Sequence, residues 1–224
     1  MSVASRERLR VLLQDPDPDL AEANLLIATE AYRRLDVDRW LGVVQQLADE
    51  AGRSGGGIDG VVSALRARGL AGDRSTYDDP RNSFLHEVLD RRVGLPIVLS
   101  VLTVAVGARS GVPIDPVAMP GHVVVADASG PVPHYLDPFD DWNERTVDEL
   151  REIVRSTTGI AIVPEHLAPT PPRAIVRRML VNLTGSFMRR ELYRDARWTV
   201  ELQAIVDPDD PEIDEQLRAF DGLA

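Results

Sequence analysis

The sequence predicts an α+β fold, in which a buried central helix packs against a small antiparallel sheet and helical extensions flank both sides. The central helix is predicted from residues 93–108, which contain no charged side chain. A helix that is apolar on every side belongs in the centre of a domain. The sheet is predicted because the hydrophobic period then changes to two, with strands at 123–125 and 135–136 around a turn cluster at 128–131.

Residues 20–50 predict two helices before this core. Asp19 suits the N-cap of the first helix and Asp36 that of the second, because their carboxylates can accept hydrogen bonds from the first free N–H groups. Apolar residues recur at helical spacing, namely Leu20, Ala23, Ile27 and Ala31 in the first helix, then Trp40, Val43, Val44 and Leu47 in the second. A glycine-rich loop at 53–57 precedes a short helix at 58–67.

The segment that leads into the central helix predicts one further helix. Asp79 is a suitable N-cap and Pro80 suits the first helical position, so a helix is expected to start there and to end near Gly94. It would bury Phe84, Leu85, Val88 and Leu89. Pro96 then begins the central helix, and Gly111 is placed to end it.

A capping box formed by Thr146 and Glu149 predicts a helix over 147–155, and the prolines that follow mark a boundary. We therefore expect an N-terminal helical region at 1–72, a core at 73–168 and a C-terminal helical region at 169–224. Helical spacing in the last region predicts a core-packing face, with a protein-docking surface as the alternative, made by Ile175, Val176, Met179, Leu180 and Leu183.

Composition and charge exclude several functional classes. The chain has 224 residues with 25 Lys+Arg and 36 Asp+Glu, a net charge of −11, and all of its basic residues are arginines. This acidic balance argues against a nucleic-acid or anionic-membrane partner. The absence of cysteine excludes disulfides, thiolate metal sites and a cysteine nucleophile. No apolar stretch reaches the roughly 18 residues of a membrane span. An acidic chain without disulfides fits the cytosol, so we expect a cytoplasmic protein, and nothing indicates a cofactor.

The hairpin brings two candidate catalytic residues together. A four-residue loop at 128–131 would place His122 directly opposite Asp137 at a non-hydrogen-bonded pair, with Cβ atoms about 4.5–5.5 Å apart. An aspartate at that range can fix the imidazole tautomer and stabilise its protonated form. The pair is therefore either a catalytic dyad, or what remains of one, or a structural hydrogen bond.

A hydrolase or acyl-transferase would also need a nucleophile. Ser100, one turn inside the central helix, is the candidate hydroxyl, and the alternative is a bond back to the carbonyl four residues earlier. His86 and Glu87 resemble the start of a zinc-peptidase helix motif, but no second histidine follows one turn later. A solvated helix face is the favoured interpretation of that segment.

Four segments carry a family resemblance. They are Tyr77-Asp78-Asp79-Pro80-Arg81-Asn82-Ser83, residues 88–100 with Gly94-Leu95-Pro96 inside them, Pro120-Gly121-His122 and Tyr135-Leu136-Asp137-Pro138-Phe139. Together they resemble the SirB-one family of the transglutaminase-like superfamily, which implies a papain-like core. The resemblance also implies C-terminal helices similar to tetratricopeptide-type helices.

In cysteine-bearing members of that superfamily, a Gly-x-Cys motif opens the central helix. Here Gly94-Leu95-Pro96 opens it, so the resemblance puts Pro96 at the position of the attacking cysteine and the family's histidine and aspartate at His122 and Asp137. Asn82 and Ser83 fall within a family motif and are candidates for ligand contact, with capping and local hydrogen bonds as the favoured alternative.

Two functions follow from these observations. The first is a non-catalytic binding or regulatory module whose partner is another protein, in an assembly whose size the sequence leaves open. The second is a hydrolase or acyl-transferase in which His122 and Asp137 activate a hydroxyl. The first is favoured, because an acid–base pair without a nucleophile would have to use water.

Overall fold

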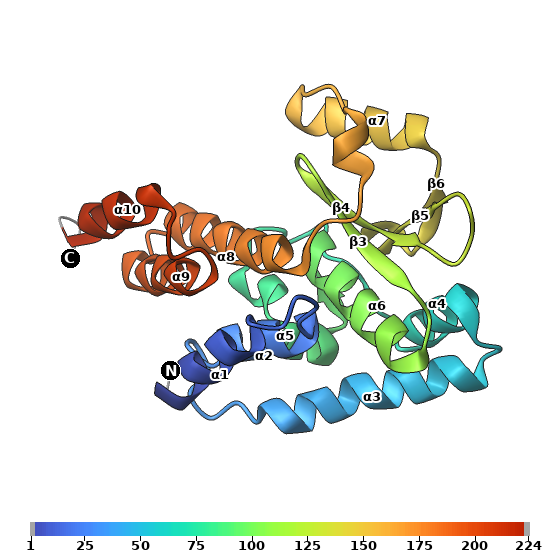
Figure 1. The fold of residues 1–224 in the computed structure, drawn as a ribbon, viewed down its shortest axis with the longest axis horizontal. Helices are drawn as coiled ribbons and strands as arrows, with labels where there is room; N and C mark the ends of the chain where they lie inside the picture. The colour runs from blue at the N-terminus through green and yellow to red at the C-terminus, as the bar shows by residue number, and fades with distance from the viewer. Residues whose placement is uncertain (1–2, 222–224) are drawn as a thin grey trace.

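The computed structural model describes residues 3–221, and over that range it has ten α-helices and a four-stranded antiparallel sheet (Figure 1). The central helix α6 (Pro96–Ser110) packs against strands β3 (Ile114–Met119) and β4 (His122–Asp127). The sheet order is β3-β4-β5-β6. The predicted α+β class, with a central helix against a small antiparallel sheet, is therefore confirmed.

The other elements surround this centre. The N-terminal helices are α1 (Val3–Leu12), α2 (Leu20–Ala28), α3 (Val37–Arg53) and α4 (Gly57–Ala67). Between α4 and α6 lie β1 (Ala71–Gly72), the 3-10 helix η1 (Pro80–Ser83), α5 (Leu85–Arg91) and β2 (Val93–Gly94). After β4 come β5 (His134–Asp137), η2 (Pro138–Asp140), β6 (Asn143–Arg145), α7 (Val147–Thr158) and η3 (Pro164–Leu167). The chain continues through α8 (Pro172–Arg189), α9 (Tyr193–Val206) and α10 (Pro211–Asp221).

The predicted helix caps are present. The Asp19 carboxylate accepts hydrogen bonds from the second and third N–H groups of α2, and Asp36 caps α3 in the same way through Arg39 N. The capping box of Thr146 and Glu149 begins α7. Gly111 ends α6 with φ 73°, a left-handed conformation that glycine adopts without strain.

Two hydrophobic clusters cover the two faces of the sheet. The larger cluster surrounds α6 and draws on all three predicted regions, with Leu26, Val101 and Leu180 among its members. The smaller cluster lies between the opposite face and α7, where Val124 of the sheet meets Leu150 and related side chains. Figure 1 shows α6 and α7 on opposite sides of the sheet. None of the helices in residues 3–221 combines the length and apolar character needed to cross a bilayer.

The prediction of a single helix after Asp79 is wrong. The chain forms η1 and then α5, separated by Phe84 in an extended conformation with φ −108° and ψ 119°. Asn24 of α2 explains the break, because its buried amide donates to Ser83 O at 3.0 Å and accepts from Leu85 N at 2.7 Å. These bonds replace the helical ones that an uninterrupted helix would form across Phe84.

The predicted hairpin register is also wrong, by two residues. Asp127 pairs with His134 instead of Val132, so the loop spans 128–133. The longer loop places Pro131 and Pro133 outside the hydrogen-bonded ladder. This suits both residues, because proline has no N–H group to donate. Because side chains alternate with a period of two, a shift of two residues keeps His122 and Asp137 on the same face of the sheet.

Strand β3, which contains Pro116, was not predicted. The strand is at the edge of the sheet, where a residue without an N–H group is tolerated. Thr170 covers this edge, because its N–H donates to Pro116 O at 2.8 Å and its hydroxyl accepts from Ala118 N at 2.9 Å. Helix α1 and the short strands β1, β2 and β6 were likewise not predicted.

The buried hydrogen bond between Trp142 and α6 gives a first prediction. Trp142 Nε1 donates to Thr103 Oγ1 at 2.9 Å, and the two residues are 1 % and 0 % exposed. Thr103→Val keeps the shape but leaves a buried N–H without an acceptor, so the free energy of unfolding is expected to fall by about 1–3 kcal/mol. Urea denaturation measures it. In a Trp142→Phe background the same substitution should cost much less, and an equal cost in both backgrounds would contradict the assignment.

Candidate functional site

His122 and Asp137 form a close pair at one end of the sheet. His122 is the first residue of β4, and Asp137 is the last residue of β5. The His122 Nε2 and Asp137 Oδ2 atoms are 3.0 Å apart, and the second carboxylate oxygen accepts from Phe139 N at 3.1 Å, which caps η2. The structure therefore brings the two candidate residues together, although through a diagonal contact between strands instead of a directly opposed one.

The contact with Asp137 orients the imidazole of His122. An ionised carboxylate only accepts hydrogen bonds, so Nε2 of His122 carries the proton and Nδ1 is the basic nitrogen. Asp137 is 3 % exposed and the His122 side chain 11 %, which places the interaction in a largely dehydrated setting where it is strong. Arg145 Nε, 3.8 Å from Asp137 Oδ2, adds a positive charge beside the carboxylate.

Phe139 holds the imidazole from the side. The ring centroids of His122 and Phe139 are 6.3 Å apart at an interplanar angle of 80°. Phe139 also lies against Gly72, where an added Cβ would come within 2.4 Å of the phenyl ring. A side chain at this position of β1 would therefore clash with both the ring and the backbone carbonyl of Phe139.

The position expected for a nucleophile is occupied by Pro96. It is the first residue of α6, is buried, and lines the same cleft as His122. Ser100 is 0 % exposed, and its hydroxyl donates to Val123 O at 3.5 Å, so it meets neither His122 nor the carbonyl four residues earlier. Ser83 Oγ is buried, and no hydrogen-bond partner for it occurs in the described structure.

An open cleft of about 390 Å³ lies between the start of α6, the turn before β4 and helix α8. The polar side chains that line it are Tyr77, His122, Arg178, Asn182, Ser186 and Arg189. Four of these side chains lie on α8 and recur at helical spacing. The spacing is visible in the sequence, but the sequence does not show that α8 borders His122. Neither Arg178 nor Arg189 was predicted to be a site residue.

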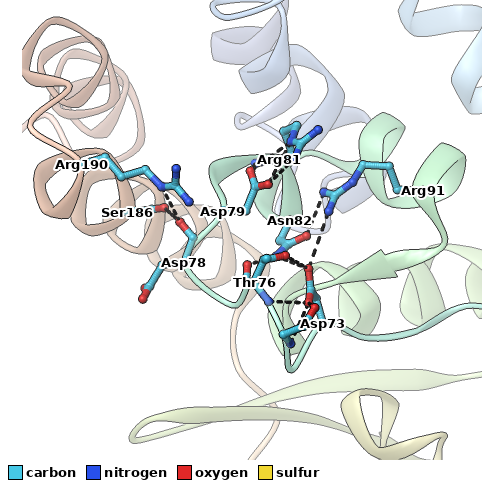
Figure 2. Close-up of polar contacts among 10 residues, drawn as sticks. Asp73, Thr76, Asp78, Asp79, Arg81, Asn82, Arg91, Ser186 and Arg190 are labelled. Atoms are coloured by element: carbon cyan, nitrogen blue, oxygen red, sulfur yellow. Dashed lines mark hydrogen bonds and ion pairs between the residues drawn. The ribbon is translucent and has the colours of Figure 1, made fainter.

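Tyr77 reaches the cleft on a loop that is held by buried polar bonds (Figure 2). The Asp73 carboxylate accepts from the N–H groups of Ser75 and Thr76, from both of their hydroxyls, and from Asn82 Nδ2 at 3.0 Å. Asn82 Nδ2 also donates to Thr76 O at 2.8 Å, and Arg91 donates to Asn82 Oδ1 at 2.9 Å. The Asn82 side chain is thus engaged in ordering this loop.

Helix α8 fastens the far end of the same loop. Ser186 Oγ donates to Asp78 O at 2.6 Å, and Arg190 Nε donates to the same carbonyl at 3.2 Å, as Figure 2 shows. Tyr77 precedes this anchored residue, and its ring meets Phe139 edge-on at 5.8 Å. The loop and α8 therefore build one wall of the cleft beside His122, and Phe139 packs against Tyr77 of that loop.

His86 corrects one expectation. It does not lie on a solvated helix face but is 7 % exposed and packs against Tyr32 at a centroid distance of 4.3 Å, with Trp40 and Phe84 nearby. Burial lowers the pKa of His86. Periodicity could not show this, because the aromatic residues that cover His86 come mainly from the segment 32–40. Within residues 3–221 no group of three or more His, Asp or Glu side chains could hold a metal ion.

Comparison with known protein families adds to this geometry. The family model of the transglutaminase-like superfamily matches residues 37–181, which include α6, the sheet, His122 and Asp137. The chain belongs to the transglutaminase-like superfamily. The match extends from α3 into α8, so both helical flanks contribute to the family domain.

Several proteins from other organisms are similar to this superfamily member. A UPF0162 protein of Xylella fastidiosa (strain 9a5c) is 35% identical over 150 residues, which cover 64% of this chain and 53% of the relative. A UPF0162 protein of Vibrio cholerae is 32% identical over 147 residues, which cover 64% of this chain and 54% of the relative. F-box only protein 21 of Homo sapiens is 26% identical over 153 residues, covering 63% and 24%. The chain thus spans about half the length of the first UPF0162 relatives, and no solved structure matches it.

Acid should act on the Tyr77 loop through Asp73. Burial alone would raise the pKa of Asp73, but hydrogen bonds from Thr76, Ser75 and Asn82 outweigh it and hold the pKa well below its usual value. A depressed carboxyl pKa stabilises the fold above the unfolded value, and this stabilisation is lost as pH falls through the folded value. Asp73→Asn should therefore lower the free energy of unfolding at pH 7 by about 2–3 kcal/mol.

The difference between Asp73→Asn and the parent protein should shrink as pH falls below about 4, where the carboxyl group begins to be protonated in the unfolded chain. Urea denaturation at pH 7 and at stepwise lower pH measures this. The exposed Asp209, changed to asparagine, is the matched control and should have little effect at any pH. A pH-independent loss for Asp73→Asn would contradict the electrostatic explanation.

Proposed function

We propose that this protein is a non-catalytic member of its superfamily, which binds a protein partner at the cleft beside His122. The observation that supports this most directly is the combination of an intact His122–Asp137 pair, an open cleft, and Pro96 at the position where a nucleophile would stand. A proline side chain carries no group that can attack a carbonyl. The site therefore keeps the means to orient a ligand without the means to form a covalent intermediate.

The bonding of Ser100, the candidate hydroxyl, supports the non-catalytic proposal. Activation by a histidine needs a hydrogen bond of about 2.6–3.2 Å between nucleophile and base. Ser100 is instead turned toward Val123 O and has no exposed surface. The alternative of a hydrolase or acyl-transferase that uses Ser100 is for this reason the weaker one.

The C-terminal helices support a protein as the partner. Helices α8 and α9 pack as an antiparallel pair, with Thr184 bonded to Thr199 and Phe187 in edge contact with Trp198. This arrangement agrees with the tetratricopeptide-like character that the SirB-one resemblance implies. Because α8 also forms one wall of the cleft, a segment bound beside His122 would contact this helix of the pair as well.

Substitution of Pro96 by cysteine tests the position assigned to the nucleophile. The protein contains no cysteine, so Pro96→Cys introduces a single thiol. His122 and the helix start should lower the pKa of that thiol from about 8.5 to below about 7.5. The pH dependence of iodoacetamide alkylation measures it. The double variant Pro96→Cys/His122→Ala should return the value toward 8.5, and identical profiles for both would contradict the assignment.

Two experiments test the function itself. Affinity capture from a lysate of the parent organism should recover a partner with the unchanged protein and with His134→Ala, whose side chain is exposed, but not with His122→Ala. A partner set unaffected by His122→Ala would move binding away from the cleft and contradict the proposal. A fluorophosphonate probe should not label the protein, whereas labelling that disappears in Ser100→Ala would establish the enzyme instead.

A further inference from the structure

One arginine in the cleft lacks the carboxylate that its neighbours have. Arg178 reaches from α8 to the turn before β4, where Nη1 donates to Met119 O at 2.5 Å and Nη2 to His122 O at 3.2 Å. In the part of the chain that the structure describes, no acidic side chain pairs with it. By contrast, Arg177 and Arg189 each lie 2.6 Å from a carboxylate oxygen, on Asp210 and Asp78 respectively.

The missing anion has an electrostatic cost. Burial lowers the pKa of Arg178, which shows that its surroundings disfavour the charged form. Carbonyl oxygens offer partial negative charge, but a partly dehydrated guanidinium is compensated fully only by an anion. The Tyr77 hydroxyl lies in the same cleft and is uncharged at neutral pH, as for an ordinary tyrosine, and burial raises its pKa further. A ligand that brings one negative charge would remove this imbalance.

Hydrogen-bond donors around Arg178 suit a carboxylate. A guanidinium has five N–H groups, and two bonds to backbone carbonyls leave donors for a second partner. Tyr77 and Asn182 line the same cleft, and no hydrogen bond within residues 3–221 engages the Tyr77 hydroxyl or the Asn182 amide. Since Asp78 balances Arg189, the cleft has one uncompensated positive charge, which matches a carboxylate better than a doubly charged phosphate.

We propose that the cleft binds a carboxylate group of a peptide, held by Arg178 and placed next to His122. This inference rests on the proposed binding function and names its ligand chemistry. The carboxylate comes either from an acidic side chain or from the C-terminus of the partner, and both present the same planar pair of oxygens to a guanidinium. The cavity volume of about 390 Å³ lies within the range of small-ligand sites.

NMR titration of ¹⁵N-labelled full-length protein tests the ligand chemistry. The probes are N-acetyl-Ala-Glu-Ala-amide, its glutamine analogue, and N-acetyl-Ala-Ala-Ala with a free C-terminus. At least one of the two carboxylate peptides should shift resonances of the cleft and bind at least about tenfold more tightly than the glutamine analogue. The tighter of the two identifies the source of the carboxylate. Equal binding of the glutamine analogue, or tighter binding of inorganic phosphate, would overturn the proposal.

Arginine variants test the residue assigned to the ligand. Arg178→Met should weaken carboxylate binding at least about tenfold, and Arg178→Lys, which keeps the charge but loses the forked donor, should weaken it less. Arg177→Met on the same helix is the matched control and should bind as the parent protein does, because Arg177 is paired with Asp210. If Arg178→Met does not fold, the loss in Arg178→Lys carries the test, and a loss as large in Arg177→Met would overturn the assignment.

The outcomes separate this inference from the proposed function. A partner captured in a His122-dependent manner, without any preference for carboxylate peptides, would overturn the carboxylate site and leave the binding function in place. Labelling of Ser100 by the fluorophosphonate probe would overturn the non-catalytic function, while selective carboxylate binding that depends on Arg178 would still stand.

Discussion

The structure depends on the burial of α6, a helix that offers no polar side to water. Such a helix has to be covered in all directions, so the sheet packs on one side of it and the N-terminal helices on the other. The helix begins with Pro96 and ends at Gly111. Proline is favoured at the first position of a helix, and glycine is favoured just after its end. Because α6 begins where the sheet meets α8, its first residue necessarily lies in the cleft beside His122.

The apolar core sets where the cleft lies, and buried hydrogen bonds hold the loop that forms one of its walls. Asn24 breaks the helix before α5, Asp73 and Asn82 order the following loop, and Ser186 of α8 anchors it. Each of these groups is buried and would be costly if left without partners. The wall that carries Tyr77 is therefore a well-bonded part of the fold, and the Asn82 side chain is used in bonds within it.

The chemistry of the cleft follows from which charges are balanced. His122 has Asp137, and Arg189 has Asp78, but Arg178 has only carbonyl oxygens. The proposed binding function rests on these charges and on the proline that begins the central helix. Superfamily membership accounts for the fold, whereas the function depends on the residues that line the cleft.

Local patterns in the sequence determined the central helix and the caps at Asp19, Asp36 and Thr146, because each depends on residues close in the chain. They also determined the shared face of His122 and Asp137, because side chains alternate along a strand with a period of two. Tertiary structure alone decided the hairpin register, the burial of His86, and the reach of Arg178 to the turn before β4. These features depend on contacts between segments far apart in the sequence, whose distances no local pattern encodes.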